Sequence, residues 1–220
     1  MNQLNPAGFS HSSQSLRVVD KLENDGQGLN LTFEVRDGIA NHTGEDLAFT
    51  LEGQLIKYAD RIAYINHDID DAVRASIISY SDIPTELSDI LGYSHGDRIN
   101  TMVRSVIEYG VNNGSNTSFG VGFTEPIGTA TYRLREFMFE KVYRNEKAKS
   151  EDGRVTKMLE LLYGYFKSKP ESLSPEYRKF IDSDGIDVAV CDYIAGMTDR
   201  YALAVFDSLF VPRAWAVNKQ

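Results

Sequence analysis

Apolar residues recur every three or four positions across residues 50–79, and no proline interrupts this stretch. Because 3.6 residues complete a helical turn, such spacing gathers the apolar side chains on one face of a helix. The same spacing is found in residues 14–22. The chain shows no alternating strand pattern with hairpin turns, no internal repeat and no long linker. We therefore predict an all-α fold in which residues 1–220 form a single helical unit.

Other segments of the chain carry weaker helical patterns. Gly, Asn, Ser and Thr are enriched in residues 112–128, which we expect to form a loop. Thr198 has the hydroxyl of a typical helix N-cap, and Asp199 follows it in the first turn, where a negative charge is favoured. Further helices are expected at residues 29–39, 97–109, 129–144, 154–166, 175–181, 186–195 and 198–210.

Composition excludes several classes of protein. The 220 residues carry a formal net charge of −9, which disfavours an extended nucleic-acid interface. No stretch approaches the length of an apolar membrane span, so we expect no membrane contact. The only cysteine, Cys191, lies among apolar residues and indicates a buried thiol. A chain without a disulfide fits a cytoplasmic location.

A polar stripe interrupts the long helix. It consists of Asp60, Tyr64, His67, Asp68 and Asp71, whose spacing places them on one side of the helix. One interpretation is a metal and substrate face, because carboxylates and imidazoles bind divalent ions. The other is a solvated helix face, which is the commoner role of an acidic stripe. Spacing alone favours the solvated face.

Three segments of the chain carry a resemblance to a known family. Residues 8–19 read Gly-Phe-Ser-His-Ser-Ser-Gln-Ser-Leu-Arg-Val-Val, residues 51–71 contain Ala-Asp-Arg-Ile-Ala-Tyr followed by His-Asp, and residues 192–202 read Asp-Tyr-Ile-Ala-Gly-Met-Thr-Asp-Arg-Tyr-Ala. In this order they resemble the C-terminal part of the deoxyguanosine-triphosphate triphosphohydrolase-like (dNTP triphosphohydrolase) family of the HD superfamily. The resemblance implies a helical HD-domain phosphohydrolase that forms homo-oligomers.

The resemblance also implies an activity and its residues. Such enzymes use a divalent metal, such as Mg or Mn, to cleave dGTP or another dNTP to the deoxynucleoside and inorganic triphosphate. By motif match Asp60 is the last metal ligand, and Arg61 approaches phosphate. Tyr64 and Asp68 contact the sugar, and His11 meets the α-phosphate as a catalytic residue.

Three of the four metal ligands that the resemblance implies have no match in this chain. A His and a His-Asp pair should precede the segment at residues 9–11, whereas His67-Asp68 follows Asp60 on the same helix and is not that pair. We therefore expect a fold that is incomplete at its N-terminus and a weak or absent metal site. Activity of this chain alone should be impaired.

Alternative functions remain open at this point. A non-catalytic nucleotide-binding or regulatory homologue would keep the fold without turnover, and another HD-type hydrolase would act on nucleoside monophosphates or cyclic nucleotides. The sugar-contact pair favours the dNTP enzyme over the latter. A basic helix face could bind phosphate or a neighbouring subunit, but ion pairs with Glu136 and Glu140 are favoured. This face consists of Arg133, Arg135, Lys141 and Arg144.

Overall fold

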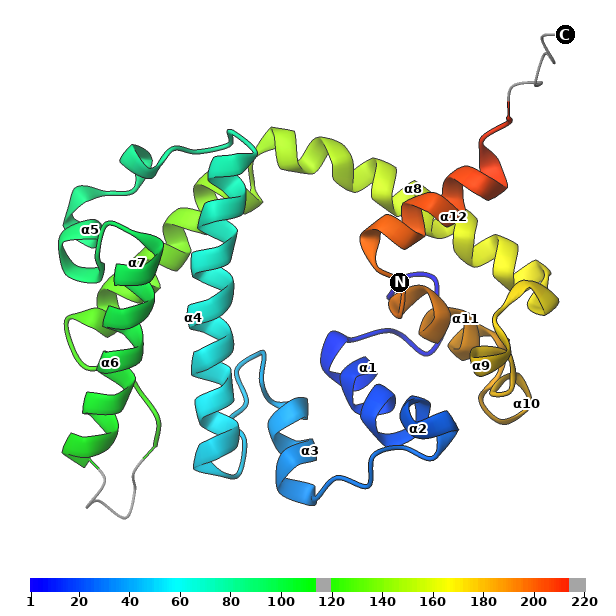
Figure 1. Cartoon of the computed structure of the whole chain (residues 1–220), viewed down its shortest axis with the longest axis horizontal. Coiled ribbons are helices and arrows are strands. Elements are labelled where there is room, and N and C mark those ends of the chain that lie inside the picture. Colours follow the sequence, from blue (N-terminus) through cyan, green and yellow to red (C-terminus); the bar gives the residue numbers. More distant parts are fainter. Residues whose placement is uncertain (114–119, 214–220) are drawn as a thin grey trace, which may run out of the picture. The chain divides into compact units, whose positions relative to one another are not determined.

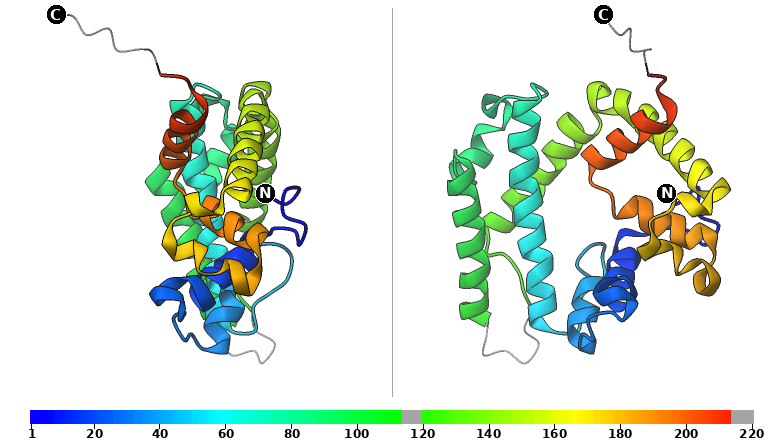
Figure 2. Two further views of the ribbon diagram at one scale, coloured as in Figure 1. Left: turned by 90° about the vertical axis from the view of Figure 1, so that its right-hand side faces the viewer. Right: turned by 45° about the vertical axis from the view of Figure 1, so that its right-hand side comes forward.

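The computed structural model describes residues 1–113 and 120–213, and every regular element within them is a helix (Figures 1 and 2). The predicted all-α fold is confirmed. Contacts divide the chain into two compact units, whereas the sequence pattern predicts a single one. Unit 1 comprises Met1–Leu29 and Gly153–Gln220, and unit 2 comprises Asn30–Asp152. The chain passes between the units twice, and the second crossing falls inside one helix, α8 (Glu146–Ser168), so no linker marks it in the sequence.

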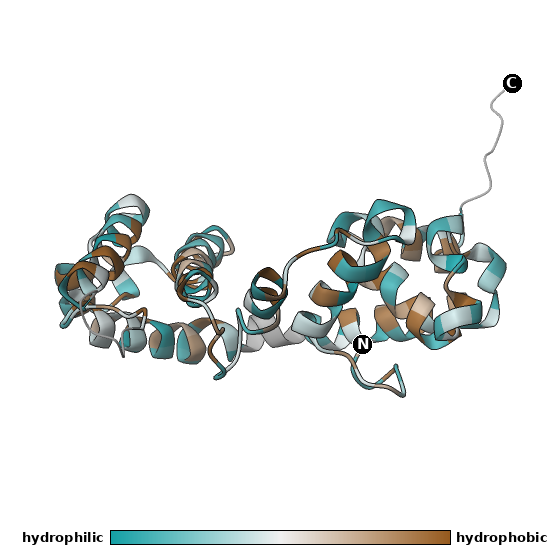
Figure 3. Ribbon diagram, turned by 90° about the horizontal axis from the view of Figure 1, so that it is seen from below, coloured by the Kyte–Doolittle hydropathy of each residue, from teal (hydrophilic) through white to brown (hydrophobic). Residues whose placement is uncertain are grey.

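Unit 2 is built around the long helix α4 (Leu51–Arg74), which packs against α6 and contacts α3 and α7. Its core consists of apolar residues on the facing sides of these helices, and Figure 3 shows the alternation of apolar and polar residues around them. Ile65, Ile69, Met102, Leu134 and Met138 have no exposed surface. The other elements are α3 (Phe33–Ala40), the 3₁₀ turn η2 (Tyr80–Asp82), α5 (Thr85–Leu91), α6 (His95–Asn113), α7 (Ile127–Met138) and the π-helical turn η3 (Phe139–Tyr143).

Helix α4 ends at Arg74, five positions before the predicted end at residue 79. Ser76 adopts the left-handed conformation with φ of 54°. The Ile77 N–H donates to the carbonyl of Ala72 at 2.9 Å, and the Ser76 N–H donates to Val73 at 3.0 Å. These two bonds form a Schellman motif, which terminates the helix. Periodicity missed this end because the apolar residues beyond the turn still serve the core.

Two glycines allow α3 to approach the start of α4. A Cβ atom at Gly53 would lie 2.6 Å from the Cβ of Ala48, and one at Gly38 would lie 3.3 Å from the Cα of Gly53. Any larger side chain would separate the helices. This close approach brings the loop after α3 alongside the first turns of α4.

Unit 1 has a separate core around α11 (Ile186–Ala195). Leu162 and Phe166 of α8 pack there with Val190 and Cys191, so the predicted burial of the thiol is confirmed. Burial raises the pKa of Cys191 to about 11, which keeps the thiol protonated. The remaining elements are α1 (His11–Arg17), the π-helical turn η1 (Val18–Leu22), the short turn α2 (Glu23–Gly26), η4 (Pro170–Ser172), α9 (Pro175–Arg178), α10 (Ile181–Asp184) and α12 (Asp199–Phe210).

Several predicted boundaries are confirmed and others shift. Helix α11 spans the predicted residues, and Thr198 caps α12 by accepting a hydrogen bond from the Tyr201 N–H at 3.2 Å. The helix predicted at 175–181 is two short helices, and the one at 129–144 is α7 continued by η3. Of the predicted loop 112–128, residues 114–119 lie outside the described part. Within the described residues no helix is long and apolar enough to cross a membrane.

Candidate functional site

A cavity of about 390 Å³ in unit 2 gathers three of the predicted site residues. Asp60, Arg61 and Tyr64 line it from α4, where spacings of one, three and four residues keep them on one side. The loop after α3 contributes the opposite wall with residues 42–45, and α7 contributes Arg135. The cavity therefore joins α4 to the loop that precedes it and to α7, which is distant in sequence.

Basic side chains outnumber acidic ones around this cavity. Its lining contains Lys57, Arg61 and Arg135 together with Glu45 and Asp60. The Lys57 ammonium is buried and donates a hydrogen bond to the carbonyl of Asp46 at 2.7 Å, which fixes it beneath the loop. Two guanidinium groups and an ammonium in a concave site suit an oxyanion such as a phosphate chain.

A hydrogen bond fixes the side chains of Arg135 and Tyr64 relative to each other. The Arg135 Nε donates a hydrogen bond to the Tyr64 hydroxyl at 3.1 Å. The guanidinium carbon also lies 4.8 Å from the ring centroid of Phe139. A guanidinium supported by one hydrogen bond and one aromatic face is oriented before any ligand arrives, which lowers the entropic cost of binding.

Asp68 lies one turn beyond Tyr64 and accepts a hydrogen bond from the Tyr143 hydroxyl of η3. Burial and this hydrogen bond raise the pKa of Tyr143, so the phenol stays neutral and continues to donate. The π-helical turn η3 carries Tyr143 toward α4. The interaction leaves Asp68 half-buried at the end of the row formed by Asp60 and Tyr64.

The polar stripe of α4 does not act as one group. Asp60, Tyr64 and Asp68 lie on the side of the cavity and η3, but His67 packs against the ring of His95, with centroids 5.1 Å apart. Asp71 is exposed and pairs with Arg74 on the surface. The interpretation of all five as one metal and substrate face is therefore not supported, because an arc of a helix wide enough to hold five residues meets more than one neighbour.

The basic face of α7 also differs from its prediction. Arg133 pairs with Glu86 of α5 at 3.0 Å, and Arg135 donates to Tyr64, so the expected pairing of these arginines with Glu136 and Glu140 is not observed. The sequence pattern assigned neither His42 nor Lys57 to a site, and for Arg135 it favoured an ion pair over a phosphate contact. For Lys57 a signal existed, since it lies within the segment that carries Asp60.

Asp60 is exposed and is the one predicted metal ligand in this cavity. No three His, Cys, Asp or Glu side chains converge into a metal-binding group anywhere in the described residues. A single carboxylate is a poor site for a divalent ion. The residues described here therefore do not by themselves fit the ion that the resemblance implies.

The first and last family-like segments meet inside unit 1. Asp192, whose side chain is fully buried, accepts hydrogen bonds from Arg17 at 2.7–2.9 Å and from the Gln14 amide at 2.8 Å. Arg17 and Lys21 also bind Asp184, both at 2.5 Å. This network ties α1 and η1 to α10 and α11. His11, the predicted catalytic residue, is the first residue of α1 and is exposed.

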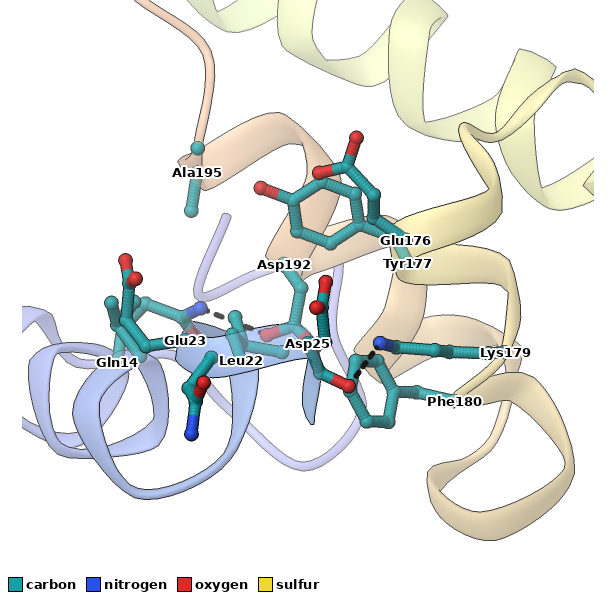
Figure 4. Close-up of a pocket in the computed structure, with 13 residues that line it drawn as sticks. Gln14, Leu22, Glu23, Asp25, Glu176, Tyr177, Lys179, Phe180, Asp192 and Ala195 are labelled. Carbon is teal, nitrogen blue, oxygen red and sulfur yellow. Dashed lines mark hydrogen bonds between the residues drawn. The ribbon is translucent and has the colours of Figure 1, made fainter. Parts of the chain in front are cut away.

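A second cavity, of about 550 Å³, lies beside this network (Figure 4). Gln14 and Asp192 are hydrogen-bonded at its floor, and Lys179 donates to the carbonyl of Asp25. Its remaining charged groups are carboxylates of Glu23, Asp25 and Glu176. These would repel a phosphate chain, so the larger cavity is the poorer candidate for a nucleotide.

The Asp184 carboxylate should make unit 1 sensitive to acid. Burial opposes its ionisation, but hydrogen bonds from Lys21, Arg17 and Ser183 outweigh burial and lower the pKa of Asp184 to about 2. A lowered folded-state pKa gives stability that is complete above the unfolded pKa near 4 and is lost as pH falls toward 2. We expect a loss of at most about 2 kcal/mol across this window. Urea titrations at several pH values should show it, and the variant Asp184→Asn should lose this part of the pH dependence; an identical slope would contradict the assignment.

Comparison with known proteins confirms the resemblance. Residues 121–208 match the family model of a phosphohydrolase-associated domain. A deoxyguanosinetriphosphate triphosphohydrolase-like protein from Caldanaerobacter subterraneus subsp. tengcongensis is 46% identical over 215 residues, covering 98% of this chain and 62% of its own. Proteins of the same name from Clostridium tetani and Clostridium perfringens strain 13 are 41% and 39% identical, each over 97% of this chain and over 63% and 64% of their own lengths. The chain thus spans less than two thirds of the length of these relatives.

Proposed function

This chain is related over nearly its whole length to the deoxyguanosinetriphosphate triphosphohydrolase-like proteins, and we propose that it supplies the nucleotide-binding face of a dNTP triphosphohydrolase. The substrate is dGTP or another dNTP, and the products are the deoxynucleoside and inorganic triphosphate. The observation that carries the proposal is the cavity of unit 2, where Asp60, Arg61 and Tyr64 meet Lys57 and Arg135.

The charges of this cavity support a role in binding phosphate. Arg61 and Arg135 can each donate two hydrogen bonds to phosphoryl oxygens, and the buried Lys57 adds positive charge behind them. Such fixed donors stabilise negative charge that grows on the leaving triphosphate, because they need no reorganisation during the reaction. In this proposal Tyr64 packs against the sugar and excludes a ribose 2′-hydroxyl. Asp68 accepts a hydrogen bond from a sugar hydroxyl, and the Tyr143 hydroxyl holds the Asp68 carboxylate in place.

Two predicted contributions lie beyond this cavity. His11 is proposed to act at the α-phosphate, as the family motif implies. When bound in the intact protein, a divalent ion would polarise a phosphoryl oxygen or acidify a water molecule. Asp60 offers it one carboxylate, so we expect this chain alone to bind such an ion weakly.

Removal of a cavity arginine should weaken nucleotide binding. We expect Arg135→Ala to reduce dGTP affinity about 10- to 100-fold, since a charge-assisted hydrogen bond contributes roughly 1.5–3 kcal/mol. Isothermal titration of the chain with dGTP would measure this. Arg104→Ala, which removes an exposed arginine of α6 in the same unit, is the matched control and should change little. Equal affinities for the chain and the Arg135 variant would contradict the proposed site.

Turnover provides the second test. The chain should release little or no deoxyguanosine and triphosphate from dGTP with manganese, compared with the full-length Caldanaerobacter relative measured side by side. Chromatography of both products is the readout. Equal rates would show that the described residues suffice and that the ligand assignment is wrong. A full-length relative that binds dGTP but releases neither product would favour the alternative of a non-catalytic nucleotide-binding or regulatory protein.

A further inference from the structure

Two histidines far apart in sequence meet on the surface of unit 2. His67 lies on α4 and His95 is the first residue of α6, and their ring centroids are 5.1 Å apart. His67 is exposed and the side chain of His95 is 31% exposed, so both rings can reach a solute. The pair is separate from the cavity described above, since neither ring lines it.

The distance between the rings suits a bridging metal ion. With metal–nitrogen bonds of about 2.1 Å, two imidazoles at a tetrahedral angle have centroids roughly 5 Å apart. The present edge-to-face arrangement, with an interplanar angle of 61°, requires the rings to turn about their χ2 bonds to direct a nitrogen each at the ion. Those torsions are soft, so the rearrangement is small.

Asp70 lies beside His95 in the position from which a carboxylate commonly orients a metal-binding histidine. The Asp70 Oδ2 lies 2.8 Å from the His95 Nδ1, although the ring does not yet point its N–H straight at the oxygen. Tyr80 donates to the other oxygen of Asp70 at 2.9 Å, and the buried Arg98 lies 3.8 Å from it. With Nδ1 turned to a carboxylate, Nε2 is the nitrogen that would bind an ion.

We propose that His67 and His95 bind a borderline divalent ion of the zinc, nickel or copper type, with water completing the coordination. Imidazole nitrogens favour these ions over Mg and Mn, which prefer oxygen. The site would join α4 to the start of α6, and an ion bound only to the folded state stabilises it. Asp70 is a positioning residue in this proposal, because it acts through His95.

Copper titration of the whole chain tests the proposal. We expect one Cu²⁺ to bind with micromolar affinity and to show nitrogen hyperfine structure from two imidazoles in its electron paramagnetic resonance spectrum. Either His67→Ala or His95→Ala should weaken binding at least 10-fold and remove one nitrogen from the spectrum. Asp70→Asn should weaken it about 10-fold while retaining both nitrogens.

His42→Ala and His11→Ala are the matched controls, since they remove the other two histidines of the chain. Thermal unfolding without copper checks that every variant is folded. Binding that survives both alanine substitutions at positions 67 and 95, or that is lost equally in the two controls, would overturn the proposal. Because dGTP binding is measured without copper, failure of this site and failure of the nucleotide site can be told apart.

Discussion

Arg17→Met should destabilise unit 1 by about 3–5 kcal/mol. The substitution keeps the apolar stem of the side chain but leaves the fully buried Asp192 carboxylate with the hydrogen bond from the Gln14 amide in place of its ion pair. A buried charge that has lost its partner costs several kcal/mol, because neither water nor a counterion replaces the lost interaction. Asp184 would lose one of its two cationic partners in the same variant.

Urea unfolding followed by circular dichroism would measure this loss. Hydrogen exchange of the amides of α1 and α11 would assign it to unit 1, since two compact units need not unfold together. The double variant Arg17→Met/Asp192→Leu should recover part of the stability, because it removes both charges. Lys157→Ala removes an exposed ion pair with Glu160 in the same unit and should cost less than about 1 kcal/mol. If the Arg17 variant costs no more than this control, the network does not stabilise unit 1.

Leu134→Ala should destabilise unit 2 by about 2–5 kcal/mol. Leu134 has no exposed surface and lies in the core between α7 and its neighbours, so truncation removes buried apolar area and leaves a cavity. Its neighbour in sequence, Arg135, lines the proposed nucleotide site. Relaxation of α7 into the space left by the truncated side chain would therefore move the Arg135 guanidinium and weaken dGTP binding as well.

Unfolding in urea and dGTP titration of the same variant test both consequences. Val111→Ala is the control in unit 2, since Val111 is 78% exposed and its truncation should change stability by no more than about 0.5 kcal/mol. Loss of stability with unchanged dGTP affinity would show that Arg135 is held by Tyr64 and Phe139 rather than by the core. A cost as small as that of the control would contradict the packing of α7.

The sequence by itself determined the helical class, most helix positions and the residues that belong to one face of α4. These properties depend on neighbours within a few positions, because helical periodicity and capping are local. Thr198 and α11 were predictable for this reason, and so was the short row of Asp60 and Tyr64. The family-like segments added roles for these residues that spacing alone did not favour.

Tertiary structure decided which elements meet those faces. Arg135 reaches Tyr64 across 71 positions, and Arg17 reaches Asp192 across 175, so no local pattern could pair them. The same packing separated His67 from the row of Asp60 and placed it against His95. A helix pattern fixes the direction of each side chain around its own axis, but the partner on each side depends on how whole helices pack, and that is a property of the complete core.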